Sequence, residues 1–134
     1  MAVFKLRVLT PEKVFFDGDC EQLTAKTTSG YVGILKGHAP YVASIVPSEM
    51  KIKADGNSRS AAISDGVVKV SADDTVTVLT SAIEWSDEID VARAERARER
   101  AEKQLKAQTS RTEFDLAERQ LKRAVNRISV AGKK

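Results

Sequence analysis

Apolar and polar residues alternate along the first 86 residues of the chain and recur every three or four residues after that. In the stretch "VFKLRVLT", Phe4, Leu6 and Val8 share one side, whereas Lys5 and Arg7 lie on the other. The stretches "MKIKA", "VVKVS" and "TVTVLTSAIEW" repeat the alternation. A period of two residues is typical of β-strands that bury one face, so residues 1–86 are expected to form strands.

Residues that favour turns separate these stretches at short intervals. They are Asp17-Gly18, Asp55-Gly56-Asn57, Asp65-Gly66 and Asp73-Asp74. The spacing accommodates about ten short strands, and no helix-length segment interrupts them. We therefore predict that residues 1–86 form one domain, an antiparallel β-sandwich.

The pattern changes at Ser86, where "SDEIDVARAERARERAEKQLKAQ" begins. This stretch contains no Gly or Pro and is dense in Ala, Glu, Arg and Lys, which favour helices. Ser86 is the expected N-cap, with Asp87, Glu88 and Asp90 at the positive end of the helix dipole. A narrow apolar stripe is expected along Ala94, Ala97, Ala101 and Leu105.

The stretch "TSRTEFDLAERQLKRAVNRISV" predicts a second helix. Ser110 and Glu113 have the spacing of a capping box. The connection around residues 108–110 is short, so residues 87–134 are expected to form an antiparallel two-helix hairpin. Such a thin hairpin must pack on the β-domain or on another protein to be stable. Its second apolar stripe comprises Phe114, Ala117, Leu121, Ala124, Val125 and Ile128.

Positive charge is concentrated in the predicted hairpin. Residues 1–86 contain 9 Lys and Arg against 10 Asp and Glu, whereas residues 87–134 contain 13 against 9. An acidic partner is therefore expected to meet the hairpin. Nucleic acid is disfavoured, because Asp and Glu are interleaved with the Arg and few aromatic residues are available for stacking.

The chain lacks the common signatures of enzymes and metal sites. It has one histidine, His38, and one cysteine, Cys20, so multi-histidine and CxxC metal sites are excluded. Phosphate loops of the GxGxxG and GxxxxGK[ST] types and the GxSxG elbow do not occur. We therefore expect a non-catalytic binding or regulatory protein without a metal, and Cys20 is interpreted as a small apolar residue of a strand.

Nothing in the chain predicts a membrane span or an export signal. No run approaches the roughly 20 apolar residues that a spanning helix needs. The N-terminal "MAVFKLRVLTPEK" lacks a charged leader followed by a long apolar run. A cytosolic protein is the expectation, and a stand-alone ligand- or nucleic-acid-binding module with a basic hairpin is the alternative.

Several short motifs occur in an order that points to a known family. These are "LTPEKVFFDG", "GILKGHAPYVASI" at 33–45, "SDGVVKV" at 64–70, "VTVL" at 76–79 and "EIDVARA" at 88–94. The chain resembles, over its whole length, the epsilon subunit of bacterial F-type ATP synthase, which is driven by protons or sodium ions. The most specific element is Gly-His-Ala-Pro followed at this distance by Ile-Asp-x-x-Arg-Ala.

The resemblance implies a role in the central stalk without catalytic activity. In the family, the β-sandwich binds the gamma subunit and sits against the rotor c-ring. The helical hairpin permits turnover when folded, and it inhibits ATP hydrolysis when it extends along gamma to the alpha and beta subunits. The family's hairpin meets an acidic segment of beta, which suits the positive charge found here. The implied location is peripheral, on the cytoplasmic face of the bacterial cell membrane, which is reached only through the complex.

The resemblance also implies contact residues on the β-sandwich. His38, Ala39 and Pro40 belong to the Gly-His-Ala-Pro turn, which faces gamma in the family. Tyr31 stands where many relatives carry an acidic residue that meets the rotor ring. The contact with the rotor ring is therefore expected to be more aromatic and less charged here. A hydrogen-bonded turn histidine without any role in partner binding is an equally good interpretation of His38.

A regulatory nucleotide site is the last implication. Ile89-Asp90-x-x-Arg93-Ala94 resembles the motif of relatives that bind ATP on the folded hairpin, without requiring magnesium. If the hairpin turns near 109–110, residue 93 lies opposite roughly residue 126, where clustered guanidinium groups suit a triphosphate. The alternative is that these arginines pair with Glu or dock on beta. By motif and resemblance, the candidate site comprises Glu84, Ile89, Asp90, Arg93, Ala94, Arg100, Arg123 and Arg127.

Overall fold

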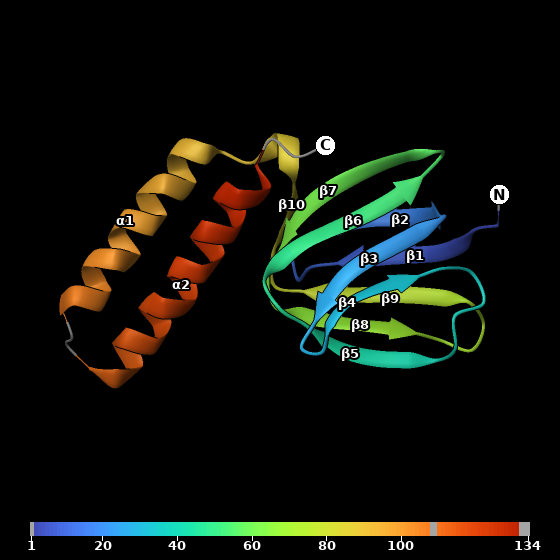
Figure 1. Cartoon of the computed structure of the whole chain (residues 1–134), viewed down its shortest axis with the longest axis horizontal. Helices are drawn as coiled ribbons and strands as arrows, with labels where there is room; N and C mark the ends of the chain where they lie inside the picture. Colours follow the sequence, from blue (N-terminus) through green and yellow to red (C-terminus); the bar gives the residue numbers. More distant parts are fainter. Residues whose placement is uncertain (1, 108–109, 132–134) are drawn as a thin grey trace.

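The computed structural model describes residues 2–107 and 110–131, which form a β-domain followed by a helical hairpin (Figure 1). The strands are β1 (Phe4–Leu9), β2 (Val14–Cys20), β3 (Gln22–Thr27), β4 (Gly30–Ile34), β5 (Tyr41–Ile45), β6 (Ser48–Ala54), β7 (Asn57–Ile63), β8 (Gly66–Val70), β9 (Thr75–Thr80) and β10 (Ile83–Trp85). A 3-10 turn, η1 (Ser86–Glu88), leads to the helices α1 (Val91–Ala107) and α2 (Arg111–Val130). The predicted β-sandwich with a two-helix hairpin is confirmed.

The strands form two layers of a sandwich. One layer has the order β10-β7-β6-β3-β4 and the other the order β5-β8-β9-β1-β2. The layers meet where β3 pairs with β5 through Thr27 and Ile45. The sandwich is antiparallel as predicted, except that β1 runs parallel to β9, with Leu6 opposite Val76. This parallel pair joins strands far apart in the chain, so no turn signal could predict it.

Apolar side chains from both layers fill the space between them. Phe4, Leu6 and Val8 are buried, whereas Lys5 and Arg7 are exposed, as the alternation predicts. Cys20 is completely buried, and this burial raises the pKa of its thiol to about 11. Cys20 is therefore a core residue, as expected. The largest fully buried side chains include Leu6, Leu23, Ile34, Met50 and Ile63.

One predicted turn is wrong. Asp17 and Gly18 lie inside β2, opposite Arg7 and Leu6 of β1. The chain turns earlier instead, where the Thr10 N–H donates to the Lys13 carbonyl and the Lys13 N–H donates to the Thr10 hydroxyl. The Thr10 hydroxyl stabilises this earlier turn by a hydrogen bond to its backbone. Asp17 and Gly18 are instead paired with β1 as residues of a strand.

The predicted start of the first helix is also wrong. Ser86 lies in the 3-10 turn, and Ile89 has an extended backbone with φ −73° and ψ 125°. The helix begins only after Asp90, whose carboxylate accepts the Arg93 N–H at 3.0 Å and so acts as the cap. The predicted cap of α2 is confirmed, because the Ser110 hydroxyl accepts the Glu113 N–H at 3.1 Å.

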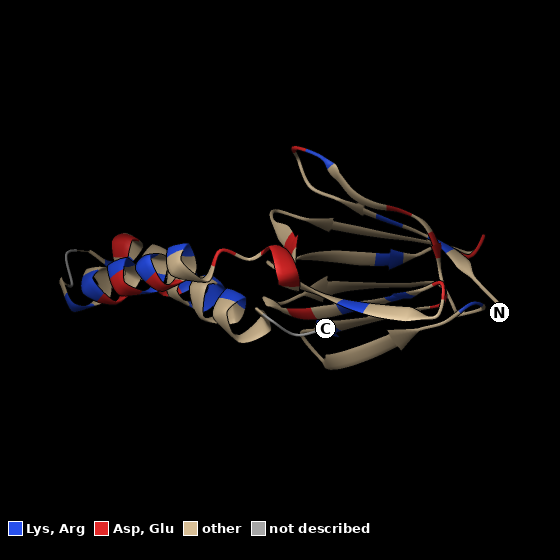
Figure 2. Cartoon of the chain, turned by 90° about the horizontal axis from the view of Figure 1, so that it is seen from above, with Lys and Arg blue, Asp and Glu red and all other residues tan. Residues whose placement is uncertain are grey.

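The two helices run antiparallel (Figure 1), and alanine residues of both helices are buried. The predicted turn at 108–110 includes residues 108 and 109, which lie outside the described residues. Phe114 and Val125 of the predicted stripe remain exposed, so only its alanine part is buried. Charged residues lie more densely along the hairpin than on the sandwich (Figure 2). The buried seam comprises Ala94, Ala101, Ala117 and Ala124.

Replacing Gly66 by Ala is expected to destabilise the sandwich. A Cβ at Gly66 would lie 2.2 Å from the Leu79 backbone oxygen of β9, which cannot move without breaking the ladder. The expected loss is about 3 kcal/mol, measured by urea unfolding. Gly18→Ala is the matched control, because its Cβ would meet only the Phe16 side chain at 3.9 Å. Equal stability of the two variants would contradict the prediction.

Candidate functional site

The hairpin contacts the sandwich through the last turns of α2. The Asn126 side-chain amide donates to the Ser48 carbonyl at 3.0 Å and to the Ile63 carbonyl at 3.4 Å. The outer face of β7 carries the small residues Ser60 and Ala62, both buried. These small side chains let α2 approach β7 closely, and the hydrogen bonds of Asn126 position the helix over them.

Two ion pairs join α2 to the sandwich beside Asn126. The Arg127 guanidinium donates to both carboxylate oxygens of Glu84 on β10, from Nε to Oε1 and from Nη2 to Oε2. Arg123 Nη2 lies 3.7 Å from Oδ1 of Asp65 in the β7–β8 turn. The backbone N–H of Asp65, the Ser64 hydroxyl and Arg123 together lower the pKa of the Asp65 carboxyl. Arg123 and Arg127 of α2 therefore dock the hairpin on the sandwich.

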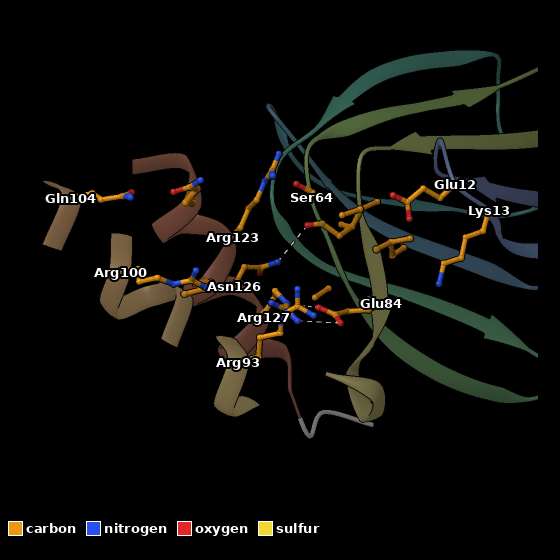
Figure 3. A pocket seen from close by; sticks show the side chains of 17 residues that line it. Glu12, Lys13, Ser64, Glu84, Arg93, Arg100, Gln104, Arg123, Asn126 and Arg127 are labelled. Carbon is orange, nitrogen blue, oxygen red and sulfur yellow. Dashed lines mark hydrogen bonds and ion pairs between the residues drawn. The ribbon is translucent and has the colours of Figure 1, made fainter. Parts of the chain in front are cut away.

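A cavity of about 820 Å³ opens between the hairpin and the adjacent end of the sandwich (Figure 3). Among the described residues, five cationic side chains line it, but only two carboxylates, Glu12 and Glu84. Its volume falls in the range of pockets that hold small organic ligands. The excess of positive charge favours an anion with several charges. The five cations are Lys13, Arg93, Arg100, Arg123 and Arg127.

The cavity gathers five of the eight candidate nucleotide-binding residues: Glu84, Arg93, Arg100, Arg123 and Arg127. The other three lie outside its lining. Ile89 is half-buried in the extended link, Asp90 caps α1, and Ala94 is buried in the seam between the helices. The structure therefore brings together the arginines that were predicted to bind a triphosphate. The Ile-Asp-x-x-Arg-Ala motif, in contrast, also has a structural explanation, since Asp90 caps α1.

Further lining residues were not predicted from the sequence. Glu12 and Lys13 come from the β1–β2 turn, which the topology alone brings to this end of the sandwich. Gln104 and Gln120 also line the cavity. The sequence contains a signal for both, because Gln104 follows Arg100 by four residues and Gln120 precedes Arg123 by three, so each pair shares a helix face. Among residues 2–107 and 110–131, no cluster of three His, Cys, Asp or Glu side chains could hold a metal ion.

The turn that carries His38 lies at the other end of the sandwich. The Gly37 N–H donates to Asp74 Oδ1 at 2.9 Å, and Gly37 has φ 83°, which suits glycine. His38 Nδ1 lies 2.7 Å from the Ala39 carbonyl, and its ring meets the Tyr41 ring edge-on at 5.6 Å. The histidine is therefore held by its own turn.

The other predicted contact residues differ in position. Ala39 and Pro40 are exposed beside His38. Tyr31 is 62% exposed at the start of β4, and the Lys26 ammonium lies 5.7 Å from its ring centroid. Since the His38 turn follows the end of β4, Tyr31 and the turn present two separate surfaces.

The chain leaves the sandwich through a clamp formed by Phe15, Arg59, Trp85 and Asp87. The Arg59 guanidinium lies 3.9 Å from the Trp85 ring centroid and 3.4 Å from Asp87 Oδ1. The Phe15 ring packs against the Trp85 ring, with 4.5 Å between the two ring centroids. The clamp attaches β10 and the start of the link to the sandwich.

Comparison with protein families identifies both parts of the chain. Residues 3–86 match the beta-sandwich domain of the ATP synthase Delta/Epsilon chain, and residues 87–132 match its long alpha-helix domain. The chain belongs to the ATP synthase delta/epsilon chain family. The resemblance inferred from the sequence motifs is thereby confirmed.

Relatives are similar to this family member over all or nearly all of its length. It is 87% identical over 134 residues to an ATP synthase epsilon chain of Ruminococcus albus, with all of both chains covered. It is 46% identical over 131 residues to the ATP synthase epsilon chain of Caldanaerobacter subterraneus subsp. tengcongensis, covering 97% of this chain and 94% of that one.

Solved structures share the fold of this delta/epsilon family member. A chain in the Euglena gracilis mitochondrial ATP synthase, OSCP/F1/c-ring complex, has a TM-score of 0.78 at 21% identity, covering 91% of this chain and 77% of that one. A chain in the Tetrahymena thermophila mitochondrial ATP synthase, central stalk/c-ring, has a TM-score of 0.57 at 22% identity, covering 64% and 69%. Within the described residues, no helix is both long and apolar enough to span a membrane.

Asn126→Asp is expected to release the hairpin from the sandwich. The substitution keeps the size of the side chain but places a carboxylate against two carbonyl oxygens, at a cost of about 3 kcal/mol. Hydrogen exchange of the α1 and α2 amides should then accelerate, while exchange in the sandwich core stays unchanged. Gln120→Glu makes the same chemical change away from these carbonyls and should leave the hairpin docked. Unaltered exchange in Asn126→Asp would refute the docking role of Asn126.

Proposed function

We propose that this chain is a non-catalytic central-stalk subunit of an F-type ATP synthase, which couples gamma to the rotor c-ring and restrains ATP hydrolysis. The observation that carries the proposal is the 87% identity, over the whole of both chains, to a protein named ATP synthase epsilon chain. Chains of the same fold occur in an F1/c-ring assembly and in a central stalk/c-ring assembly of mitochondrial ATP synthases. In this role the protein is peripheral to the cytoplasmic face of a bacterial cell membrane and reaches it only through the complex.

The β-sandwich has an exposed apolar surface that suits a protein partner. Val67 of β8 lies opposite Leu79 of β9, and Val42 of β5 is a diagonal neighbour. These side chains are 66% exposed at Val42, 40% at Val67 and 52% at Leu79. Since soluble proteins seldom gather exposed apolar residues without a use, we assign this face and the nearby His38 turn to gamma. Tyr31, at the other end of β4, is assigned to the rotor ring.

Val42→Glu is expected to weaken association with gamma. A carboxylate placed among Val67 and Leu79 would have to be desolvated when a partner covers them, and the expected loss in affinity is at least about tenfold. Co-purification and titration with gamma would measure the loss. Ser58→Glu, on the exposed part of β7 in the other layer, is the control and should bind normally. Equal binding by both variants would remove this face from the interface.

The helical hairpin is the regulatory part of the proposal. Its docking includes Asn126 and two arginine ion pairs, which water and partner residues can replace. Its basic surface suits an acidic segment of beta once it extends along gamma toward alpha and beta. In a reconstituted complex, Asn126→Asp should therefore inhibit ATP hydrolysis more strongly than the unmodified chain does.

The cavity between the hairpin and the sandwich is proposed to bind ATP as a regulatory ligand. Its arginines suit a triphosphate, and Glu84 is the carboxylate beside them. A ligand there contacts α1, α2 and β10 together, so it would favour the folded hairpin and relieve inhibition. The cation-rich lining can neutralise the phosphates directly, which supports binding without magnesium.

Arg93→Ala is expected to reduce the ATP affinity of the isolated chain by about tenfold or more. Arg93 lines the cavity, and no acidic partner of its side chain occurs among the described residues. Trp85, adjacent to Glu84, provides a fluorescence signal, with calorimetry as the second measurement, and GTP should bind more weakly. Arg96→Ala, on α1 but outside the cavity lining, should leave the affinity unchanged. If Arg93→Ala bound ATP as well as the unmodified chain, the site would be wrong.

A further inference from the structure

The turn between β6 and β7 consists of Asp55-Gly56, a dipeptide that can rearrange chemically. It lies at the end of the sandwich remote from the helical hairpin, and both residues are exposed (Figure 1). Ala54 pairs with Asn57, and φ is 53° at Asp55 and 77° at Gly56, as in tight two-residue turns. Because glycine has no Cβ, its nitrogen is open to reaction with the preceding aspartate side chain.

The rearrangement needs only water. The Gly56 nitrogen loses its proton and forms a bond to Cγ of Asp55, while a carboxyl oxygen leaves as water. The product is a five-membered succinimide ring. Water then adds to either ring carbonyl and breaks its bond to nitrogen. One route restores aspartate, and the other yields isoaspartate, in which the main chain runs through the side chain. The oxidation state does not change, so no further reactant is required.

The Gly56 N–H is held by Glu21, which lies between β2 and β3. Glu21 Oε1 accepts this N–H at 2.8 Å. The Glu21 side chain is only 10% exposed. Its Oε2 has no hydrogen-bond partner among the described residues and lies 4.0 Å from Lys53 Nζ. A carboxylate withdrawn from water to this extent depends on the few donors that reach it, so the bond to Gly56 is costly to break.

Attack on Asp55 requires that bond to break. The Gly56 nitrogen reaches Cγ only after a rotation about the Asp55 Cα–C bond, which moves the N–H away from Glu21. Loss of the proton would also place a negative nitrogen against a carboxylate, which is electrostatically unfavourable. Within the described part of the chain, the Asp55 carboxylate makes no hydrogen bond or ion pair. Glu21 is therefore the contact that restrains this dipeptide.

The other two Asp-Gly pairs of the chain are restrained by strands. Asp17-Gly18 lies within β2 and pairs with β1. In Asp65-Gly66, the glycine begins β8 and pairs with Thr80 of β9. These peptide groups can rotate only when the sheet opens, whereas Asp55-Gly56 lies outside the ladder and needs only a local opening.

We propose that Asp55-Gly56 is a site of spontaneous isoaspartate formation and that Glu21 protects it by holding the Gly56 N–H. Isoaspartate adds one carbon to the main chain of a two-residue turn, and the turn sets the register of β6 and β7. The protection therefore preserves the pairing of these two strands. It is independent of the hairpin and of the cavity beside it.

The test measures the reaction at each Asp-Gly pair by peptide mapping, after incubation of the folded full chain in heavy-oxygen water at neutral pH. Each hydrolysed succinimide incorporates one heavy oxygen, which identifies the reacted residue. Glu21→Ala removes the acceptor, so the rate at Asp55 should rise by about tenfold or more. Glu21→Gln retains an oxygen that can accept the N–H, and the increase should be smaller.

Asp17-Gly18 and Asp65-Gly66 in the same molecules are the matched controls, and their rates should stay unchanged. If all three sites accelerated together, the cause would be opening of the whole sandwich, and local protection by Glu21 would be wrong. An unchanged rate at Asp55 in Glu21→Ala would overturn the proposal as well.

Asp55→Asn makes the comparison measurable even if aspartate reacts slowly. Asn-Gly suits the same turn and forms the same ring faster, with loss of ammonia in place of water. Adding Glu21→Ala to this variant should again raise the rate at residue 55 by about tenfold or more. Equal rates with and without Glu21 in this pair of variants would refute the protection.

Discussion

The hydrogen bonds from Asn126 to two backbone carbonyls of the sandwich determine how the rest of the molecule is arranged. Ser48 begins β6 and Ile63 ends β7, so their carbonyls lie where the strand ladder stops and acceptors need a partner. A single amide satisfies both. It thereby fixes the rotation of α2, which aims Arg123 and Arg127 at the sandwich and creates the cavity beside them.

Docking by polar contacts has a consequence for reversibility. An interface made of large apolar side chains exposes them to water when it opens, whereas an amide and two guanidinium groups are readily hydrated. The clamp of Phe15, Arg59, Trp85 and Asp87 meanwhile attaches the end of the sandwich firmly. Between the clamp and α1, only residues 88–90 connect the two domains. The chain is thus held firmly where it leaves the sandwich, whereas the hairpin that follows is held weakly.

The sequence predicted features that depend on local spacing and missed those that depend on topology. Alternation identified the strands, and the helix pattern identified the hairpin, its alanine seam and the Ser110 cap. The Asp17-Gly18 turn and the Ser86 cap were wrong, because Thr10 and Asp90 provide better hydrogen bonds nearby. Lys13 and Glu12 could not be placed in the cavity, since no local pattern shows which strand ends meet the hairpin. The sequence allowed for arginines that pair with Glu, but it could not show that Glu84 is the partner of Arg127, for the same reason.

The arginines that dock the hairpin are also those that face the cavity, and this double use limits how a ligand can act. A polyanion held by the arginines of α2 alone would break their pairs with Glu84 and Asp65 and so loosen the hairpin. To tighten it, the ligand must itself connect the hairpin to the sandwich. Glu84 and Lys13 both belong to the sandwich and both line the cavity. A ligand that contacts them replaces the contacts it removes, and only such a ligand can stabilise the folded state.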